Sequence, residues 1–414
     1  MSYSSQKKQK ILHFMPDNHV WGGIEVYLKH TLPALQENSP YEIMAVVTED
    51  SQLFHELKKA GLSVRGIPFW LRKKSVFRSA WVNPWLRTLD WGVYAALNKI
   101  LKEEQPDLVH IHNGRWEQTF IKRAGFPLVM TYHGYGGLFN IEIAPNIWLK
   151  TLYEVARPLF TSLIPALSGM TIVSEYEKQR LYREGFLPVG YPAQVIHNGL
   201  PLSEFQAKVQ PGDRERLRAE FGLAPNVRVV SFTCRLRDDK NPLAFLRIAR
   251  ALMRHSNLDR PVYFLVAGDG KLSAEFEAAF ANDPILKGHG RYLGFRSDVP
   301  QLIAASDVTV STSLQEGFGL RVLESLIFGR PCVTYAAGGI PEVLALPEGQ
   351  DWLVPVGDEL AFVEKLLNVV KLPDDRLQAL SDITQTYCKK FDLTTHVHQL
   401  AQFYEGVFKT LVNQ

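Results

Sequence analysis

The feature that most constrains this 414-residue chain is a repeated alternation of short apolar runs with helical patterns. One series has apolar runs at residues 11–15, 42–47, 108–111 and 128–132, and a second has them at 227–232, 262–266, 307–310 and 332–335. Short, almost continuous apolar runs between helices are typical of parallel strands buried on both faces. The pattern therefore predicts two doubly wound, Rossmann-like α/β domains.

The boundary between the two series is a polar segment at residues 201–225, which carries mixed charges at 213–216. We place domain 1 at residues 1–200 and domain 2 at 201–394. Open parallel sheets bind ligands beyond the carboxyl ends of their strands. With two such domains, we expect the active site in a cleft that both domains face.

Composition excludes several classes of protein. With 46 basic and 43 acidic residues, the net charge of +3 is too small to indicate nucleic-acid binding. The three cysteines have no metal-type spacing, which disfavours a zinc ribbon or a disulfide framework. No apolar run reaches about 18 residues, and the stretch after the first lysines is too short for a signal-peptide core. We therefore expect a folded cytoplasmic protein without a transmembrane helix.

The most informative stretch runs from Glu316 to Glu324 and follows the apolar run at 307–310. Its glycines allow a close backbone approach, and a helix is expected from about Leu320 to Gly329. The first amides of a helix lack intrahelical partners and suit phosphate. Glu316 and Glu324 could then reach opposite ends of an extended ligand, sugar hydroxyls at one end and ribose hydroxyls at the other. The alternative is an ordinary loop with one solvated helix glutamate.

A second element follows the first strand of domain 2 and contains Arg235 and Lys240. Because one ends and the other begins a neighbouring element, we expect both side chains to converge on a diphosphate. The alternative is a solvated turn in which Arg237 pairs with Asp238 or Asp239.

Glycine pairs follow other predicted strands. Gly268 and Gly270 come after the run ending at Val266, where they could also form a simple tight turn. The loop at 337–342 predicts a further helix start. In domain 1, Gly22 and Gly23 would let an acceptor or a phosphate approach the backbone.

Three histidines of domain 1 lie on or directly after predicted strands. His133 follows the run at 128–132, where it could bond to a sugar hydroxyl or polarise a developing charge, or be merely structural. His110 and His112 alternate along one strand; we expect them to face the sheet interior and its mouth, and we assign them no chemistry. No Asp-x-Asp pair is placed to hold a divalent metal with a diphosphate, so no metal site is predicted.

Taken in order, these motifs resemble those of the retaining, GT-B-fold glycosyltransferases of family 4 (glycosyl transferases group 1), which use nucleotide-sugar donors. The resemblance covers nearly the whole chain, and its motifs are Gly22-Gly23-Ile24-Glu25, His133-Gly134, Val173-Ser174, His197-Asn198-Gly199, Arg235 with Lys240, Gly268-Asp269-Gly270, Gly294-Phe295 and Glu316 with Glu324. His197 is a departure, since the family often has proline there, which affects the expected hinge and no catalytic residue.

The resemblance implies roles for these residues. Arg235 and Lys240 would hold the donor diphosphate, Glu316 would contact the donor sugar and Glu324 the ribose. His133 would face the reacting end of that sugar. The remaining expected substrate contacts are Gly22, Gly23, Asn198, Gly268, Gly270, Phe318, Gly319 and Leu320. A final helix at 395–414 would pack back on domain 1.

The resemblance also implies glycosyl transfer with retention of configuration, by front-face attack. The leaving diphosphate would be stabilised by cations and helix amides, without a metal or another cofactor. The donor would be a UDP-sugar or, second, a GDP-sugar. The acceptor would be a glycan or a lipid-linked sugar in lipopolysaccharide, capsule, exopolysaccharide or other glycoconjugate biosynthesis.

Residues 69–100 hold four of the eight tryptophans and carry six basic residues against one acidic residue, a local net charge of +5. Tryptophan favours the headgroup level, and lysine and arginine are attracted to anionic lipid. This segment therefore predicts peripheral contact with the inner face of the cytoplasmic membrane. The alternative is a buried aromatic cluster with a solvated basic rim.

Three other functions fit parts of the pattern. A nucleotide-sugar epimerase or a phosphorylase could use the same fold, although a phosphorylase needs a larger chain with a pyridoxal-phosphate lysine. A non-catalytic nucleotide-sugar-binding module would be expected to lose Lys240 or one glutamate, and all are present. A periplasmic binding protein would need the signal peptide that the first residues do not resemble.

Overall fold

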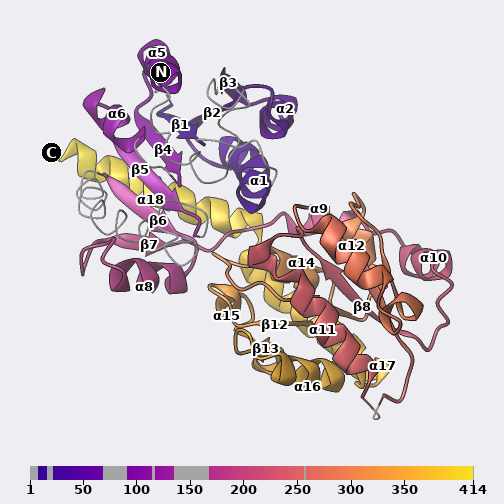
Figure 1. Ribbon diagram of the computed structural model, residues 1–414. Coiled ribbons are helices and arrows are strands. Elements are labelled where there is room, and N and C mark those ends of the chain that lie inside the picture. Colours follow the sequence, from indigo (N-terminus) through magenta and orange to yellow (C-terminus); the bar gives the residue numbers. More distant parts are fainter. Residues whose placement is uncertain are drawn as a thin grey trace, which may run out of the picture. The chain divides into compact units, whose positions relative to one another are not determined.

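The structure is a computed structural model, and it describes residues 8–15, 22–68, 91–113, 117–134, 167–255 and 258–413. The chain forms two compact units. Unit 1 comprises Met1–Leu200 with Leu393–Gln414, and unit 2 comprises Pro201–Asp392. Each unit is built on a parallel sheet with helices packed on it (Figure 1). The prediction of two doubly wound α/β domains is confirmed.

Unit 1 has a seven-stranded sheet in the order β3-β2-β1-β4-β5-β6-β7. Its strands are β1 Lys10–Phe14, β2 Glu42–Thr48, β3 Ser63–Ile67, β4 Leu108–His112, β5 Leu128–Tyr132, β6 Gly169–Ile172 and β7 Ala193–Val195. Neighbouring strands pair in parallel throughout. The strand order reverses between β1 and β4, which makes this the topological switch point of the sheet.

Helices cover both faces of this sheet. Successive side chains of a strand point to opposite faces, and in these strands both sets are largely apolar. One core packs strand residues such as Ile11 and Val47 against α1 Gly23–Asn38, α2 Gln52–Lys59 and α18 Leu393–Val412. The other packs residues such as Leu12 and Met44 against α5 Trp91–Glu104, α6 Glu117–Arg123 and α8 Glu175–Arg183. Helix α18, yellow in Figure 1, returns to unit 1 after the chain has completed unit 2.

Unit 2 has a six-stranded sheet in the order β10-β9-β8-β11-β12-β13, again parallel throughout. Its strands are β8 Arg228–Thr233, β9 Val262–Ala267, β10 Gly290–Tyr292, β11 Val308–Ser311, β12 Cys332–Tyr335 and β13 Leu353–Val354. Its helices are α9 Leu202–Ala207, α10 Asp213–Glu220, α11 Pro242–Met253, α12 Ser273–Ala281, α13 Val299–Ala305, α14 Leu320–Ile327, α15 Ile340–Val343, α16 Glu359–Val370 and α17 Asp374–Tyr387. The switch point lies between β8 and β11, so the loops that follow these two strands are the expected ligand-binding loops.

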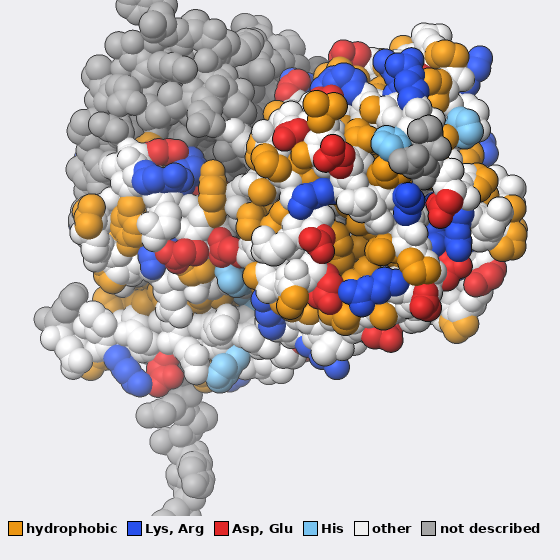
Figure 2. Space-filling model, turned by 90° about the horizontal axis from the view of Figure 1, so that it is seen from below, with side chains coloured by type: hydrophobic (Ala, Val, Ile, Leu, Met, Phe, Trp, Pro, Cys, Tyr) orange, Lys and Arg blue, Asp and Glu red, His pale blue; other side chains and the backbone are white. Residues whose placement is uncertain are grey.

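The segment predicted to contact a membrane lies mostly outside the described residues, since only its last part, the start of α5, is described. Among the described residues, no helix is both long enough and apolar enough to cross a bilayer. On the described surface that faces the viewer in Figure 2, acidic and basic side chains are interspersed among hydrophobic ones.

Candidate functional site

In unit 2, the loops after β8 and β11 are bonded to each other at the switch point. The loop after β8 forms a short 3-10 helix, Asp238–Lys240, whose Asp239 carbonyl accepts a hydrogen bond from the Leu314 amide at 2.9 Å. The Thr312 hydroxyl donates to the carbonyls of Lys240 (2.9 Å) and Asn241 (3.0 Å). These bonds fix the backbone that carries Lys240 relative to the backbone that carries Glu316.

Lys240 and Glu316 form an ion pair across these two loops. The Lys240 Nζ donates to Glu316 Oε1 at 2.5 Å, and the two side chains are 18% and 19% exposed. Burial alone would lower the pKa of Lys240, but the attraction of the Glu316 carboxylate outweighs it and the pKa is raised. The pair is thus charged and partly open to solvent, so an incoming anion can compete for the ammonium and a hydroxyl can donate to the carboxylate. The turn pairing of Arg237 with Asp239 also forms, at 2.8 Å.

The loop that carries Glu316 ends in the predicted helix start. Gly319 adopts a left-handed conformation with φ +104°, and its carbonyl accepts from the Val322 and Leu323 amides at the start of α14. Among the described residues, no hydrogen bond is made by the amides of Leu320 and Arg321. Two free amides, four and five residues after the Glu316 that pairs with Lys240, suit a phosphate group, as the sequence predicts.

Glu324 lies in α14 and is paired with Arg321 one turn earlier. The Glu324 side chain is 13% exposed and that of Arg321 is 40% exposed. Arg321 was not predicted to be a site residue. Its spacing of three residues from Glu324 on a predicted helix could have identified it, because residues at i and i+3 are neighbours on a helix surface.

Arg235 is half-buried directly after Cys234 at the end of the β8 segment. Burial raises the pKa of the Cys234 thiol to about 12, while the charges of Lys240 and Arg321 act to lower it. Cys234 therefore lies among the charges of this site. The structure brings Lys240 and Glu316 together, and Arg235 lies five residues before Lys240 on the segment that follows β8.

The predicted glycines allow neighbouring loops to touch. A Cβ on Gly268, at φ +148°, would lie 1.8 Å from the Cys234 carbonyl oxygen, and one on Gly270, at φ +155°, would lie 2.5 Å from that of Leu236. A Cβ on Gly338, at φ +58°, would lie 1.7 Å from the Glu316 carbonyl oxygen. These glycines are required for packing between backbones, and a ligand contact of Gly268 or Gly270 stays a prediction.

Other predicted residues lie in unit 1. Gly22 is the extended residue before α1 and Gly23 is the first residue of that helix. Asn198 is buried, and its Oδ1 has no hydrogen-bond partner among the described residues. At the position that departs from the family pattern, the His197 carbonyl lies 2.7 Å from His396 Nδ1 of α18.

His133 belongs to a cluster of buried histidines at the switch point of unit 1. The other members are His13 on β1 and His110 and His112 on β4. His13 lies opposite His110 in the sheet. His133 Nε2 lies 2.9 Å from His112 Nδ1, and His112 Nε2 lies 3.0 Å from His13 Nδ1. No chemistry was predicted for His110 and His112, although their i, i+2 spacing on one strand, which pairs with β1 and β5, was the available signal.

These histidines are neutral. Burial lowers the pKa of both His13 and His133 to about 3 and holds that of His110 and His112 well below the usual 6.5. Ring nitrogens of His13, His110 and His112 lie within 4.8 Å of one another, which is compatible with a three-histidine metal site. Hydrogen bonds among these rings and to Tyr404 and Thr131 already account for the arrangement.

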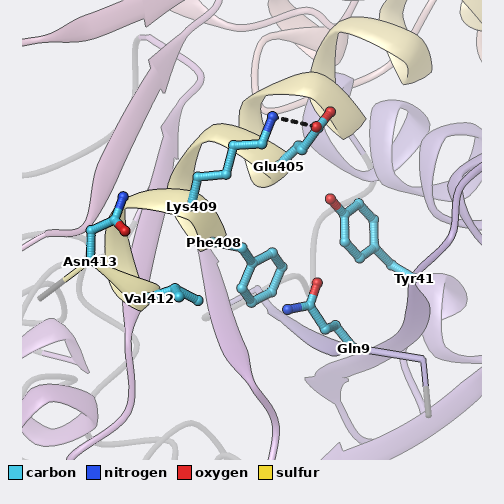
Figure 3. A pocket seen from close by; sticks show the side chains of 7 residues that line it. All are labelled: Gln9, Tyr41, Glu405, Phe408, Lys409, Val412 and Asn413. Carbon is cyan, nitrogen blue, oxygen red and sulfur yellow. Dashed lines mark ion pairs between the residues drawn. The ribbon is translucent and has the colours of Figure 1, made fainter. Parts of the chain in front are cut away.

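A shallow pocket of about 290 Å³ lies elsewhere in unit 1 (Figure 3). Gln9 and Tyr41, which precede β1 and β2, line it together with residues of α18, among them the exposed ion pair of Glu405 with Lys409. The pocket is at the amino ends of these strands. Ligands of such sheets bind at the opposite edge, so this pocket is not the expected site.

Comparison with known proteins identifies the family. Residues 21–204 match the family model Glycosyltransferase Family 4, and residues 227–371 match Glycosyl transferases group 1. A UDP-Gal:alpha-D-GlcNAc-diphosphoundecaprenol alpha-1,3-galactosyltransferase from Escherichia coli is 30% identical over 287 residues, which are 68% of this chain and 70% of that protein.

Two solved structures share the fold. The crystal structure of Anabaena Alr3699/HepE in complex with UDP and glucose has a TM-score of 0.74 at 21% identity, covering 96% of this chain and 100% of the other. The lipopolysaccharide outer core galactosyltransferase WaaB has a TM-score of 0.63 at 16% identity, covering 96% and 100%. With the two parallel-sheet units, these matches show that the chain belongs to the group 1 family of GT-B-fold glycosyltransferases.

Proposed function

We propose that this glycosyltransferase moves a sugar from a nucleoside diphosphate donor to a lipid-linked or glycan acceptor, with retention of anomeric configuration. The observation that carries the donor site is the Lys240–Glu316 pair at the switch point of unit 2, beside the free amides at the start of α14. A UDP-sugar is the first choice of donor and a GDP-sugar the second.

Each group has a defined task in this proposal. The Lys240 ammonium, the Arg235 guanidinium and the amides of Leu320 and Arg321 bind the diphosphate, whose negative charge grows as the glycosidic bond breaks. When the Lys240 ammonium donates to a phosphate oxygen, the Glu316 carboxylate is free to accept from a sugar hydroxyl. Glu324 accepts from the ribose hydroxyls. Fixed cations and amides supply the charge stabilisation that a metal would otherwise give, so we propose transfer without a metal.

The proposed stereochemistry is retention, as the family resemblance implies. Glu316 and Glu324 are both paired with cations, and neither is offered as a covalent nucleophile. We therefore propose front-face attack, in which the acceptor oxygen forms its bond to the anomeric carbon as the bond to the diphosphate breaks. The leaving phosphate oxygen takes the acceptor's proton. His133 would bond to the reacting sugar, as the family resemblance implies.

The names of similar proteins support the choice of substrates. The Escherichia coli relative is named for a UDP-Gal donor and an acceptor linked to diphosphoundecaprenol. The Anabaena structure was solved with UDP and glucose, and WaaB is a lipopolysaccharide outer core galactosyltransferase. We therefore propose a role in the assembly of a cell-surface glycoconjugate, with the acceptor at the inner face of the cytoplasmic membrane. The contact of residues 69–100 with that membrane stays a prediction.

The test measures turnover of a panel of UDP- and GDP-sugars with lipid-linked and free glycan acceptors. Lys240→Ala and Glu316→Ala should each lower kcat by about 100-fold or more, because each removes charge stabilisation without removing core packing. Asp238→Ala is the matched control: it lies on the same loop, both members of its ion pair with Lys271 are exposed, and its turnover should be unchanged.

Circular dichroism should show the same fold in all variants. Near-normal turnover of Lys240→Ala or Glu316→Ala would refute the donor site. Turnover of the wild type should persist in excess chelator, and a loss that added metal reverses would refute the metal-free site. Binding of a sugar nucleotide without any turnover would favour a binding module.

A further inference from the structure

A continuous line of hydrogen bonds runs through the buried face of unit 1 and ends at His133. It begins at Tyr404 of α18, whose hydroxyl lies 3.4 Å from His13 Nε2. It continues from His13 Nδ1 to His112 Nε2 over 3.0 Å and from His112 Nδ1 to His133 Nε2 over 2.9 Å. We call these four residues the histidine line. Three of its members are at most 2% exposed, and His133 is 9% exposed.

The far end of the line is the ring nitrogen of His133 that remains for a ligand. The His133 backbone amide is held by Asn113 Oδ1 at 2.8 Å, and its Nε2 is held by His112. No described residue bonds to its Nδ1. His133 follows β5, at the edge of the sheet where ligands of this fold bind.

Two bonded ring pairs allow only two proton arrangements. A neutral imidazole has one donor and one acceptor nitrogen, and burial keeps these rings neutral. If His13 donates to His112, then His112 donates to His133, and His133 Nδ1 carries a hydrogen. If His133 donates to His112, then His112 donates to His13, and His133 Nδ1 is a bare acceptor. The state of His133 Nδ1 is therefore tied to that of His13 Nε2, at the other end of the line.

Tyr404 selects between the two arrangements. Its hydroxyl has one proton and two neighbouring nitrogens, His110 Nδ1 at 2.5 Å and His13 Nε2 at 3.4 Å. A phenol hydroxyl is a better donor than an imidazole N–H, and a bare imidazole nitrogen is a better acceptor than a phenol oxygen, so in the shorter bond Tyr404 donates to His110. The Tyr404 oxygen then accepts from His13 Nε2–H. His110 Nε2–H donates to Thr131 Oγ1 at 2.7 Å, and Thr131 in turn lies 2.6 Å from the Thr171 hydroxyl.

We propose that the histidine line fixes His133 Nδ1 as a hydrogen-bond acceptor for a substrate hydroxyl, and that His13 and His112 are positioning residues that act through His133. The identity of that hydroxyl, on the reacting sugar, rests on the proposed function. The proton arrangement of the line rests only on the contacts above.

The arrangement can be tested without any activity. Two-bond proton–nitrogen correlation spectra of protein labelled with ¹⁵N-histidine distinguish the two tautomers, and single-histidine variants assign the signals. His13, His112 and His133 should all be Nε2–H tautomers between pH 6 and pH 8. A mixture of tautomers among the three would overturn the coupling, and three Nδ1–H tautomers would overturn the acceptor role. Stoichiometric zinc in the purified protein would overturn the line itself.

The positioning role is tested with a matched pair of variants at one position. In His112→Asn the side-chain amide replaces Nδ1 and can still accept from His133, whereas in His112→Gln it replaces Nε2 and reaches only toward His13. His112→Gln should lower kcat by about 10- to 100-fold, because a displacement of about 1 Å at the reacting centre can cost about 100-fold, and His112→Asn should lose clearly less. UDP affinity, a property of unit 2, should be unchanged in both.

Equal losses in the two variants, or none, would overturn the positioning role. If the wild type transfers no sugar at all, the proposed function fails, while the tautomer spectra still decide the proton arrangement. If either variant fails to fold, the spectra of the wild type serve in the same way.

Discussion

Both units have polar residues at the switch point of the sheet, but these residues differ in burial and charge. At the β1/β4 switch point of unit 1, His13 and His110 are almost fully buried and neutral. At the β8/β11 switch point of unit 2, Lys240 and Glu316 are charged and partly exposed. A neutral, buried cluster can offer an oriented hydrogen bond, and an open ion pair can exchange its partner for an anion. The same sheet edge thus supports two kinds of recognition.

The difference follows from what covers each edge. In unit 1, α1 and α18 contribute Tyr27 and Tyr404, whose rings pack on the histidines, and His396, whose ring packs on Tyr27. Water is excluded there, so a charge would be costly. In unit 2, the charged residues lie on loops beyond the ends of the strands, and glycines allow those loops to pack backbone against backbone.

The largest expected effect is that mild acid destabilises unit 1 more than unit 2. The folded-state pKa values of His13 and His133 (about 3), His396 (about 4), His110 and His112 all lie below the unfolded value of 6.5. Their full contribution to stability is present above pH 6.5. It falls as the pH drops toward the folded values, because only the unfolded chain binds protons. At pH 5 the loss is about 2 kcal/mol for each of His13, His133 and His396, or about 6 kcal/mol for the three, which is within the range of a domain's stability, and His110 and His112 add to it.

The described part of unit 2 has no buried histidine. Hydrogen exchange at pH 7, 6 and 5, corrected for the intrinsic rates, should therefore show β4 and β5 losing protection before β8 and β9. Simultaneous loss in both sheets would contradict this assignment.

The next largest effect is expected from glycine substitutions in unit 2. They should lower the free energy of unfolding strongly only where two loops are in contact. Gly338→Ala and Gly268→Ala each place a Cβ within 2 Å of a carbonyl oxygen at a positive φ, and should each lower the free energy of unfolding by about 3 kcal/mol or more. Gly357 is the control, since at φ +87° its Cβ would meet no atom within 4 Å. Gly357→Ala should cost about 1 kcal/mol, from backbone strain alone. Urea unfolding measures all three, and equal costs would refute the packing role.

The charge pair should give the smallest effect on stability. A double-mutant cycle of Lys240→Met and Glu316→Gln should yield a coupling free energy of about 1 kcal/mol, because the pair is partly solvated. Thermal unfolding of the four proteins measures it. Such a small coupling, beside a large loss of turnover, would assign the pair to ligand binding. A coupling above about 3 kcal/mol would instead make it a structural element of unit 2.

The sequence predicted most of the strands, because buried parallel strands are continuous apolar runs. The predicted run at 332–335 coincides with β12, and that at 128–132 coincides with β5. Four strands were not predicted, since each has only two to four residues: β6, Gly169–Ile172, β7, Ala193–Val195, β10, Gly290–Tyr292, and β13, Leu353–Val354. Such strands are set by the neighbour that they pair with.

The candidate site was predictable as residues but not as contacts. Lys240 and Glu316 lie 76 residues apart, and their ion pair depends on β8 and β11 being neighbours. The contacts of the histidine line were still harder to predict. It depends on the order β1-β4-β5 and on Tyr404, which comes from a helix 294 residues after His110.

The return of α18 to unit 1 has a consequence for how the protein is made. Unit 1 is translated first, yet the helix that covers one face of its sheet is translated after all of unit 2. Until then, the apolar face that receives Leu400 and Phe403 is uncovered, and the histidines of β1 and β4 lack Tyr404. The part of the protein that leaves the ribosome first is therefore the part that finishes folding last.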